Sequence, residues 1–150
     1  MLQTDYAKGG IIAPTPDNAG EVVSYRAEID LATSDLTLNN IIEMGPLPGD
    51  CDLVDVILDT DDLDSGTAAI TLDVGIMSGD FGVSSGSRTC GAEIFSASTV
   101  AQAGGVVRPT LATAFRIARS HVDRGIGVKI KAAPDTPQAG TLGLTVIYRG

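Results

Sequence analysis

The feature that most constrains the fold is a period-two pattern of apolar residues that occurs twice, on either side of a short acidic turn. The pattern runs through Asp52–Asp59, stops at Thr60–Gly66 and resumes at Ala68–Ile76. Because consecutive side chains of a β-strand point to opposite faces, each segment presents one apolar face. These faces consist of Val54, Val56 and Leu58 in the first segment and Ala68, Ile70, Leu72, Val74 and Ile76 in the second. We expect two antiparallel strands that pair as a hairpin around the acidic turn.

The same alternation recurs in three other segments. Residues 21–32 alternate between an apolar face and a charged one, which predicts a long strand with one solvated face. Residues 125–133 and 142–148 also alternate, and they flank a turn rich in proline and glycine at 134–140. We expect these last two segments to pair as a second hairpin.

The remaining segments carry weaker signals. Residues 36–44 and 111–118 are interpreted as extended, and the polar, glycine-rich residues 78–91 as a long surface loop. In residues 93–103, apolar side chains recur at helical spacing before Gly104 and Gly105, which predicts one short helix.

Together these segments predict an all-β fold, an antiparallel β-sandwich with one short helix, for which jelly-roll topology is one candidate. Residues 21–150 form its single domain. Residues 1–20 hold several glycines and prolines and only Ile11 and Ile12 as an apolar pair, so we expect an extended, flexible N-terminal arm that becomes ordered on a partner.

Charge and hydropathy exclude several classes of partner. The formal net charge of −9 disfavours direct binding to nucleic acid, which requires clustered lysine and arginine. No apolar stretch approaches the ~20 residues that cross a bilayer, so a soluble protein is expected. The first residues have neither a basic nor an apolar region typical of a secretory signal, so export by the general route is not expected.

The charges are unevenly distributed along the chain. Residues 1–64 carry most of the acidic residues and only two basic ones, Lys8 and Arg26, whereas residues 88–150 are net basic. The simpler interpretation is that strands from both halves interleave and their charges mix on one surface. The alternative is that the acidic part of one subunit faces the basic part of its neighbour and steers association.

No pattern of catalytic residues is found. Cys51 and Cys90 lack the spacing of a zinc site and are expected to be free thiols, although a bridge formed after release from a cell is an alternative. His121 lies between Ser120 and Asp123, but near neighbours in one strand do not converge as a Ser-His-Asp triad does. We expect no enzyme activity and no cofactor.

The acidic turn is the strongest candidate for a metal site. Its carboxylates would repel one another unless a cation or their separation relieved the repulsion, and calcium is the cation that such oxygens prefer. The EF-hand pattern fails, because apolar residues occupy two of its ligand positions and the sixth position is not glycine. A solvated turn is therefore the favoured interpretation. The candidate ligands are Asp59, Asp61, Asp62 and Asp64.

Several strings resemble a known family. Residues 36–48 (LTLNNIIEMGPLP), 54–64 (VDVILDTDDLD), 70–75 (ITLDVG), 99–106 (TVAQAGGV) and 132–142 resemble the small structural proteins that tailed bacteriophages encode beside the major capsid protein. The resemblance covers roughly residues 21–150. The polar insert at residues 78–91 departs from it.

The resemblance implies a virion structural protein of the capsid decoration, or cement, type. Such a protein is made in the host cytoplasm and binds the outer capsid surface, with the major capsid protein as its partner, often as a trimer. The arm, through Ile11, Ile12, Pro14 and Pro16, is expected to contact the capsid or a neighbouring subunit. A tail or neck subunit and a carbohydrate or host-surface binding module remain alternatives, because one sandwich fold serves unrelated functions.

Overall fold

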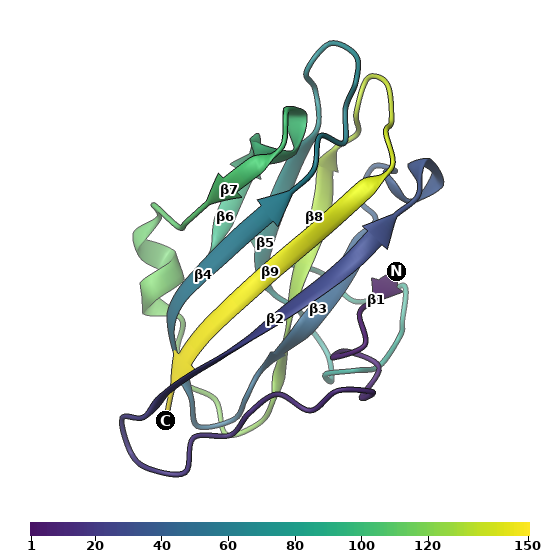
Figure 1. The fold of residues 1–150 in the computed structure, drawn as a ribbon. Coiled ribbons are helices and arrows are strands. Elements are labelled where there is room, and N and C mark those ends of the chain that lie inside the picture. The colour runs from purple at the N-terminus through teal and green to yellow at the C-terminus, as the bar shows by residue number, and fades with distance from the viewer.

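Two β-sheets face each other in the computed structural model, which describes residues 1–150 (Figure 1). The five-stranded sheet, sheet A, contains in spatial order β1 (Leu2–Gln3), β3 (Ile41–Leu47), β8 (Arg124–Ala132), β5 (Thr71–Ile76) and β6 (Phe95–Ser98). The four-stranded sheet, sheet B, contains β2 (Val22–Leu31), β9 (Gly140–Arg149), β4 (Asp52–Thr60) and β7 (Gly105–Val107). The helical segments are short 3₁₀ turns, η1 (Thr33–Asp35), η2 (Val100–Gln102) and η3 (Ala112–Arg116), and no helix is long and apolar enough to cross a membrane.

The strand order is that of a jelly roll. Strands β2, β9, β4 and β7 of sheet B face strands β3, β8, β5 and β6 of sheet A, and β1 adds a parallel strand to the edge of sheet A. Among consecutive strands, only β5 and β6 pair with each other. The predicted all-β antiparallel sandwich is therefore confirmed, with the jelly-roll topology that was one of its candidates.

Both predicted hairpins are wrong. Strand β4 lies in sheet B and β5 in sheet A, and likewise β9 lies in sheet B and β8 in sheet A, so each turn crosses from one sheet to the other. The two turns lie at the same end of the sandwich (Figure 1) and bond to each other: Ser65 N–H donates to the Thr136 carbonyl at 3.0 Å, and Gln138 N–H to the Leu63 carbonyl at 3.1 Å. The alternation located the strands correctly but did not determine their partners.

Three local predictions are also corrected. The segment predicted as a helix, 93–103, instead contains β6 and the single turn η2, because Ala97 has a positive φ of 51° that breaks any helix there. The extended segment predicted at 36–44 is found as β3, which begins at Ile41 and ends at Leu47. It contains a β-bulge between Glu43 and Gly45. Residues 111–118, predicted as extended, contain the 3₁₀ turn η3, which is held by buried Ala114.

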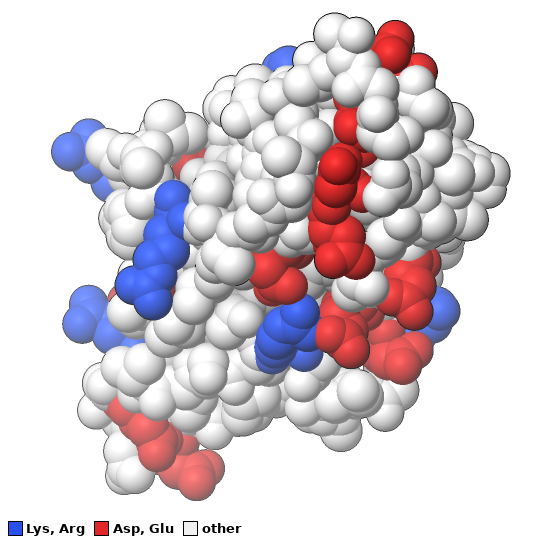
Figure 2. Space-filling model, turned by 45° about the horizontal axis from the view of Figure 1, so that its top comes forward, with Lys and Arg blue, Asp and Glu red and all other residues white.

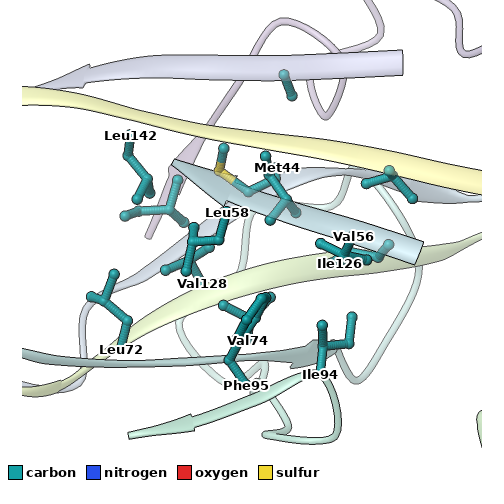
Figure 3. Packing of buried hydrophobic residues seen from close by; sticks show 14 of the residues in the cluster. Met44, Val56, Leu58, Leu72, Val74, Ile94, Phe95, Ile126, Val128 and Leu142 are labelled. Atoms are coloured by element: carbon teal, nitrogen blue, oxygen red, sulfur yellow. The ribbon is translucent and has the colours of Figure 1, made fainter. Parts of the chain in front are cut away.

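The alternating apolar residues meet between the sheets, as Figure 3 shows for side chains from both layers. Predicted strand 21–32 is confirmed as β2, with its apolar side chains inward and its charged ones in solvent. In β4 the inward alternation holds at Val56 and Leu58, but a register shift between Leu53 and Asp55 leaves Val54 only half-buried. Burial of these aliphatic side chains is the main source of stability for such a fold.

The outer face of sheet A is covered by the polar insert between β5 and β6, which sequence alone indicated to be a surface loop. Arg88 from this insert is buried, and its guanidinium lies 2.8 Å from the buried Glu43 carboxylate of β3. The insert can lie flat because glycines face it: a Cβ on Gly127 would lie 2.7 Å from Met77, and one on Gly75 would overlap the backbone of Gly91. The insert is thus an integral part of the fold.

Residues 1–20 run along the outside of the same sandwich (Figure 1). Strand β1 pairs with β3, and Thr4 and Ala7 are buried. Further along, Ala13 joins the core and the Tyr148 hydroxyl donates to the Pro14 carbonyl. The N-terminal segment is therefore anchored to its own chain at both ends of its path.

Candidate functional site

The acidic turn is organised around Asp64, which is 2% exposed. Its carboxylate accepts four backbone N–H bonds, from Ala69 at 2.8 Å, Ile70 at 3.1 Å, Asp135 at 3.2 Å and Thr136 at 3.1 Å. Burial disfavours the ionised form, but the four N–H donors outweigh it and lower the pKa of Asp64 to about 2. The side chain holds the two crossing turns together.

The other three acidic residues of the turn have separate partners. Asp59 lies 2.7 Å from the Arg26 guanidinium, Asp61 accepts the Thr141 N–H at 2.8 Å, and Asp62 accepts the Asp64 N–H at 2.9 Å. No group of three or more histidine, cysteine, aspartate or glutamate side chains is close enough to hold a metal ion. The structure therefore separates the four candidate ligands and gives each a structural contact.

The residues considered for catalysis are also apart. His121 is exposed and its Nδ1 lies 2.7 Å from Asp50, whereas Asp123 accepts the Gly49 N–H at 2.8 Å and the Ser120 hydroxyl donates to Val122. Ser120, His121 and Asp123 thus bond to different groups and form no relay.

Cys51 and Cys90 are free, as expected from the sequence, and both are buried. Burial raises the pKa of both thiols, and that of Cys90 to about 12. Because the thiolate is the reactive form of cysteine, burial makes both side chains less reactive than an ordinary thiol.

The most exposed large apolar side chain, that of Ile12, lies on the N-terminal segment. Ile12 is 88% exposed and Ile11 is 47% exposed. They border a hollow of ≈ 390 Å³ that is also lined by Phe81 and His121. Pro14 and Pro16, the other two predicted contact residues, lie against their own chain, Pro14 through Tyr148 and Pro16 beside the C-terminal residue. The segment therefore exposes two isoleucines, while the two proline positions that follow contact the rest of the chain.

A second group of exposed apolar residues lies at the other side of the sandwich. Val106 of β7 is 67% exposed, Phe115 of η3 is 54% exposed, and Leu111 lies between them in the chain. Sequence reasoning did not identify this group, because Val106 and Phe115 sit in segments without a clear period. A phenylalanine exposed beside Arg116, in a chain with only three phenylalanines, was the available signal.

The ion pairs agree with the simpler of the two interpretations made from the sequence. Ion pairs join acidic residues of the first part of the chain to basic residues of the last, such as Asp52 with Arg119 and Asp55 with Arg108, so the strands do interleave. Figure 2 shows a band of acidic side chains on its right-hand half and several basic ones along its left-hand side, but also basic side chains near the middle and an acidic group at the lower left, so both signs occur across this face.

The candidate polar side chains bind groups of their own chain, and exposed apolar side chains lie on an anchored surface segment. This arrangement favours a structural protein that acts through its surfaces. No protein-family model matches the chain, and no curated protein matches it. Among solved structures, a chain from the capsid of Ralstonia phage GP4 is 49% identical, with a TM-score of 0.94 over 99% of this chain and 96% of that chain. The chain belongs to this family of phage capsid structural proteins.

Two more distant likenesses share the fold alone. A chain of the cyanophage Pam1 capsid asymmetric unit is 23% identical, with a TM-score of 0.65 over 93% of this chain and 91% of that one. A chain of the acid-stable capsid of Helicobacter pylori bacteriophage KHP30 is 14% identical, with a TM-score of 0.53 over 87% and 92%.

Proposed function

We propose that this protein is a capsid decoration protein. It binds the outer surface of a phage capsid, with the major capsid protein as its partner, and stabilises the contacts between capsomers. The observation that carries the proposal is the 49% identity over 99% of the chain to a protein of the GP4 capsid. The rigid jelly roll and its exposed surface segment suit adhesion to a shell.

Residues 11–16 form the proposed contact with the capsid or a neighbouring subunit. Ile11 and Ile12 insert into an apolar recess of the partner, while Pro14 and Pro16 keep the segment on its own sandwich. Replacing an exposed isoleucine costs the free protein little stability. Complete burial of one isoleucine against a partner stabilises the complex by about 1.5–3 kcal/mol. A pair of them is therefore a strong anchor once it is covered.

The test is binding of the purified protein to heads that lack it. We expect the variant Ile11→Ser/Ile12→Ser to bind on the order of 100-fold more weakly than wild type. The control Leu38→Ser replaces an apolar side chain of similar exposure outside the segment and should bind as wild type. Wild-type binding by the double variant would overturn the contact assignment.

The location itself is tested by cryo-electron microscopy of the virion. Density for this jelly roll on the outer face of the shell, bridging neighbouring capsomers, is expected. Density in the tail or the neck, or inside the shell, would overturn the decoration role. The proposed oligomer is a trimer, in which three copies share one site on the shell.

A further inference from the structure

The two sides of sheet B carry opposite charges and different surfaces. The spatial order of its strands is β2, β9, β4, β7, so β2 and β7 are its opposite edges. We define the β7–η3 face as residues 105–119 and the β2 edge as residues 22–35. We propose that copies of this chain associate head-to-tail, with the β7–η3 face of one copy against the β2 edge of the next. This inference rests on the proposed trimer.

The β7–η3 face has the composition of a protein interface. Val106, Leu111 and Phe115 are exposed on it, and residues 94–120 contain no acidic residue. Its exposed Arg116 has no ion-pair partner within the chain, and Arg108 is 66% exposed beside Asp55. Arginine next to exposed aromatic and aliphatic side chains is characteristic of surfaces that become buried by a partner.

A hollow at this side of the sandwich gives the face its shape. It has a volume of ≈ 280 Å³ and is lined by Phe95 of β6, Val107 of β7, Arg108 and Leu111, among others. The hollow thus lies where the edge strands of both sheets meet, with a basic side chain and apolar ones around it. Because Arg108 borders the hollow, acidic groups of a partner suit this face.

The β2 edge offers acidic groups. Glu28 and Asp30 are exposed on β2, and Asp35 follows on η1. The only basic residue in the segment is Arg26, which already pairs with Glu28 and Asp59. Strand β2 pairs only with β9, so its other side has no partner strand in this chain.

The distribution of charge selects the geometry. If two β7–η3 faces met about a two-fold axis, Arg108 and Arg116 would lie against the same arginines of the other copy. If two β2 edges met in this way, Glu28 and Asp30 would lie against the same acidic residues. Opposite signs meet only when the face of one copy contacts the edge of the next, which is a heterologous contact. A heterologous contact generates a ring when its rotation closes, and a three-membered ring is the one that matches the proposed trimer.

Charge reversal on either side tests the contact. We expect wild type to sediment as a trimer and both Arg108→Glu/Arg116→Glu and Glu28→Lys/Asp30→Lys to sediment as monomers with unchanged circular dichroism. The combined four-substitution variant restores opposite signs at every contact of the ring, so it should recover the trimer. Such recovery excludes misfolding as the cause of the two monomers.

Asp80→Lys is the control, because it reverses an exposed acidic charge on the insert between β5 and β6, outside both surfaces. It should remain a trimer. For wild type we expect the dissociation constant to rise at least about tenfold between low and high salt.

Three results would overturn the head-to-tail contact: a wild-type monomer at all concentrations, a trimer insensitive to both reversals, or no recovery in the four-substitution variant. Binding to heads is measured on the same variants. If wild type is a monomer that still binds heads, the head-to-tail contact is overturned and the decoration role stands. If wild type is a trimer that does not bind heads, the decoration role is overturned and the contact stands.

Discussion

Asp64 shows how one carboxylate in a turn can determine the connection between two sheets. Its oxygens receive N–H groups from the turn that follows it and from the turn between β8 and β9. An isolated carboxylate at this depth would be costly, but four donors satisfy it. Asp64 therefore connects its own turn to a turn that is about 70 residues away in the sequence.

The variant Asp64→Asn tests this connection. The amide directs an NH₂ group at backbone donors, so we expect a lower urea midpoint at pH 7. Because the folded pKa of about 2 lies below the ordinary 3.8, the carboxylate stabilises the fold fully above pH ~4, and this contribution is lost as pH falls through about 2. The difference between wild type and variant should therefore vanish between these two pH values.

Asp80→Asn is the control for this experiment, since Asp80 is exposed and its side chain makes no hydrogen bond. It should have the urea midpoint of wild type at pH 7. A difference between wild type and Asp64→Asn that stays constant down to pH 2 would contradict this role of Asp64.

A second residue-scale prediction concerns the buried ion pair of Arg88 with Glu43. Arg88→Met leaves the Glu43 carboxylate buried without its cation, which should lower the free energy of unfolding by about 3–5 kcal/mol. Adding Glu43→Gln removes the stranded charge and should recover part of the loss. Urea unfolding measures both variants, with Arg116→Met as an exposed arginine control; equal losses in the single and double variants would argue against charge burial as the cause.

At the residue scale, sequence predicted the candidate chemistry only in part. The crowding of acidic residues at 59–64 was visible, but which of them would be buried depended on the distant turn at 135–136. Likewise, Arg88 occurs in a stretch of small polar residues typical of solvent, and nothing near it in sequence indicates Glu43. Long-range partners decide the role of a charge, and a single sequence does not display them.

At the scale of elements, the insert between β5 and β6 is positioned by glycines. Gly75 of β5 lies directly under Gly91, and the backbone there cannot move aside as a flexible side chain could. Small residues on the outer face of sheet A thus allow a loop to pack as a third layer. This layer shields the Arg88 and Glu43 pair from water.

Gly75→Ala should therefore lift the insert. We expect a loss of about 1–3 kcal/mol in the free energy of unfolding from overpacking, and faster proteolysis within residues 77–93. Gly86→Ala is the matched control, because nothing lies within 4 Å of its added Cβ. If the two variants are equally stable, close packing of the insert is not what requires glycine at position 75.

Sequence predicted strands better than their pairing. Alternation records which side chains are buried, and β2, β4, β8 and β9 all occur where it is regular. It does not record whether a turn returns to the same sheet or crosses to the other one. In the turn after β4, buried Leu63 and Asp64 bind the opposite crossing loop, and this contact, which no local pattern shows, replaces the expected hairpin.

At the scale of the whole molecule, the N-terminal segment belongs partly to the fold and partly to the surface. It supplies β1, the buried Ala13 and the acceptor for the Tyr148 hydroxyl, and Tyr6 packs on Tyr25 with ring centroids 4.6 Å apart. Nearly all of the core cluster nevertheless comes from residues 21–150. We therefore expect the sandwich to fold without the segment.

Deletion of residues 1–20 tests this division. We expect the truncated chain to keep the far-ultraviolet circular dichroism of a β-protein and cooperative unfolding, but with a free energy of unfolding lower by a few kcal/mol, because the segment covers Tyr25 and bonds Tyr148. The full-length variant Ile11→Ser/Ile12→Ser is the comparison: its substitutions are on exposed side chains, so its stability should stay within about 0.5 kcal/mol of wild type.

The two variants separate anchoring from adhesion. If both fail to bind heads and only the deletion loses stability, the segment is anchored by one set of residues and adheres by another. An unfolded deletion variant would instead show that the first 20 residues are part of the domain itself, since a sandwich that needs its N-terminal strand to fold has no separable arm.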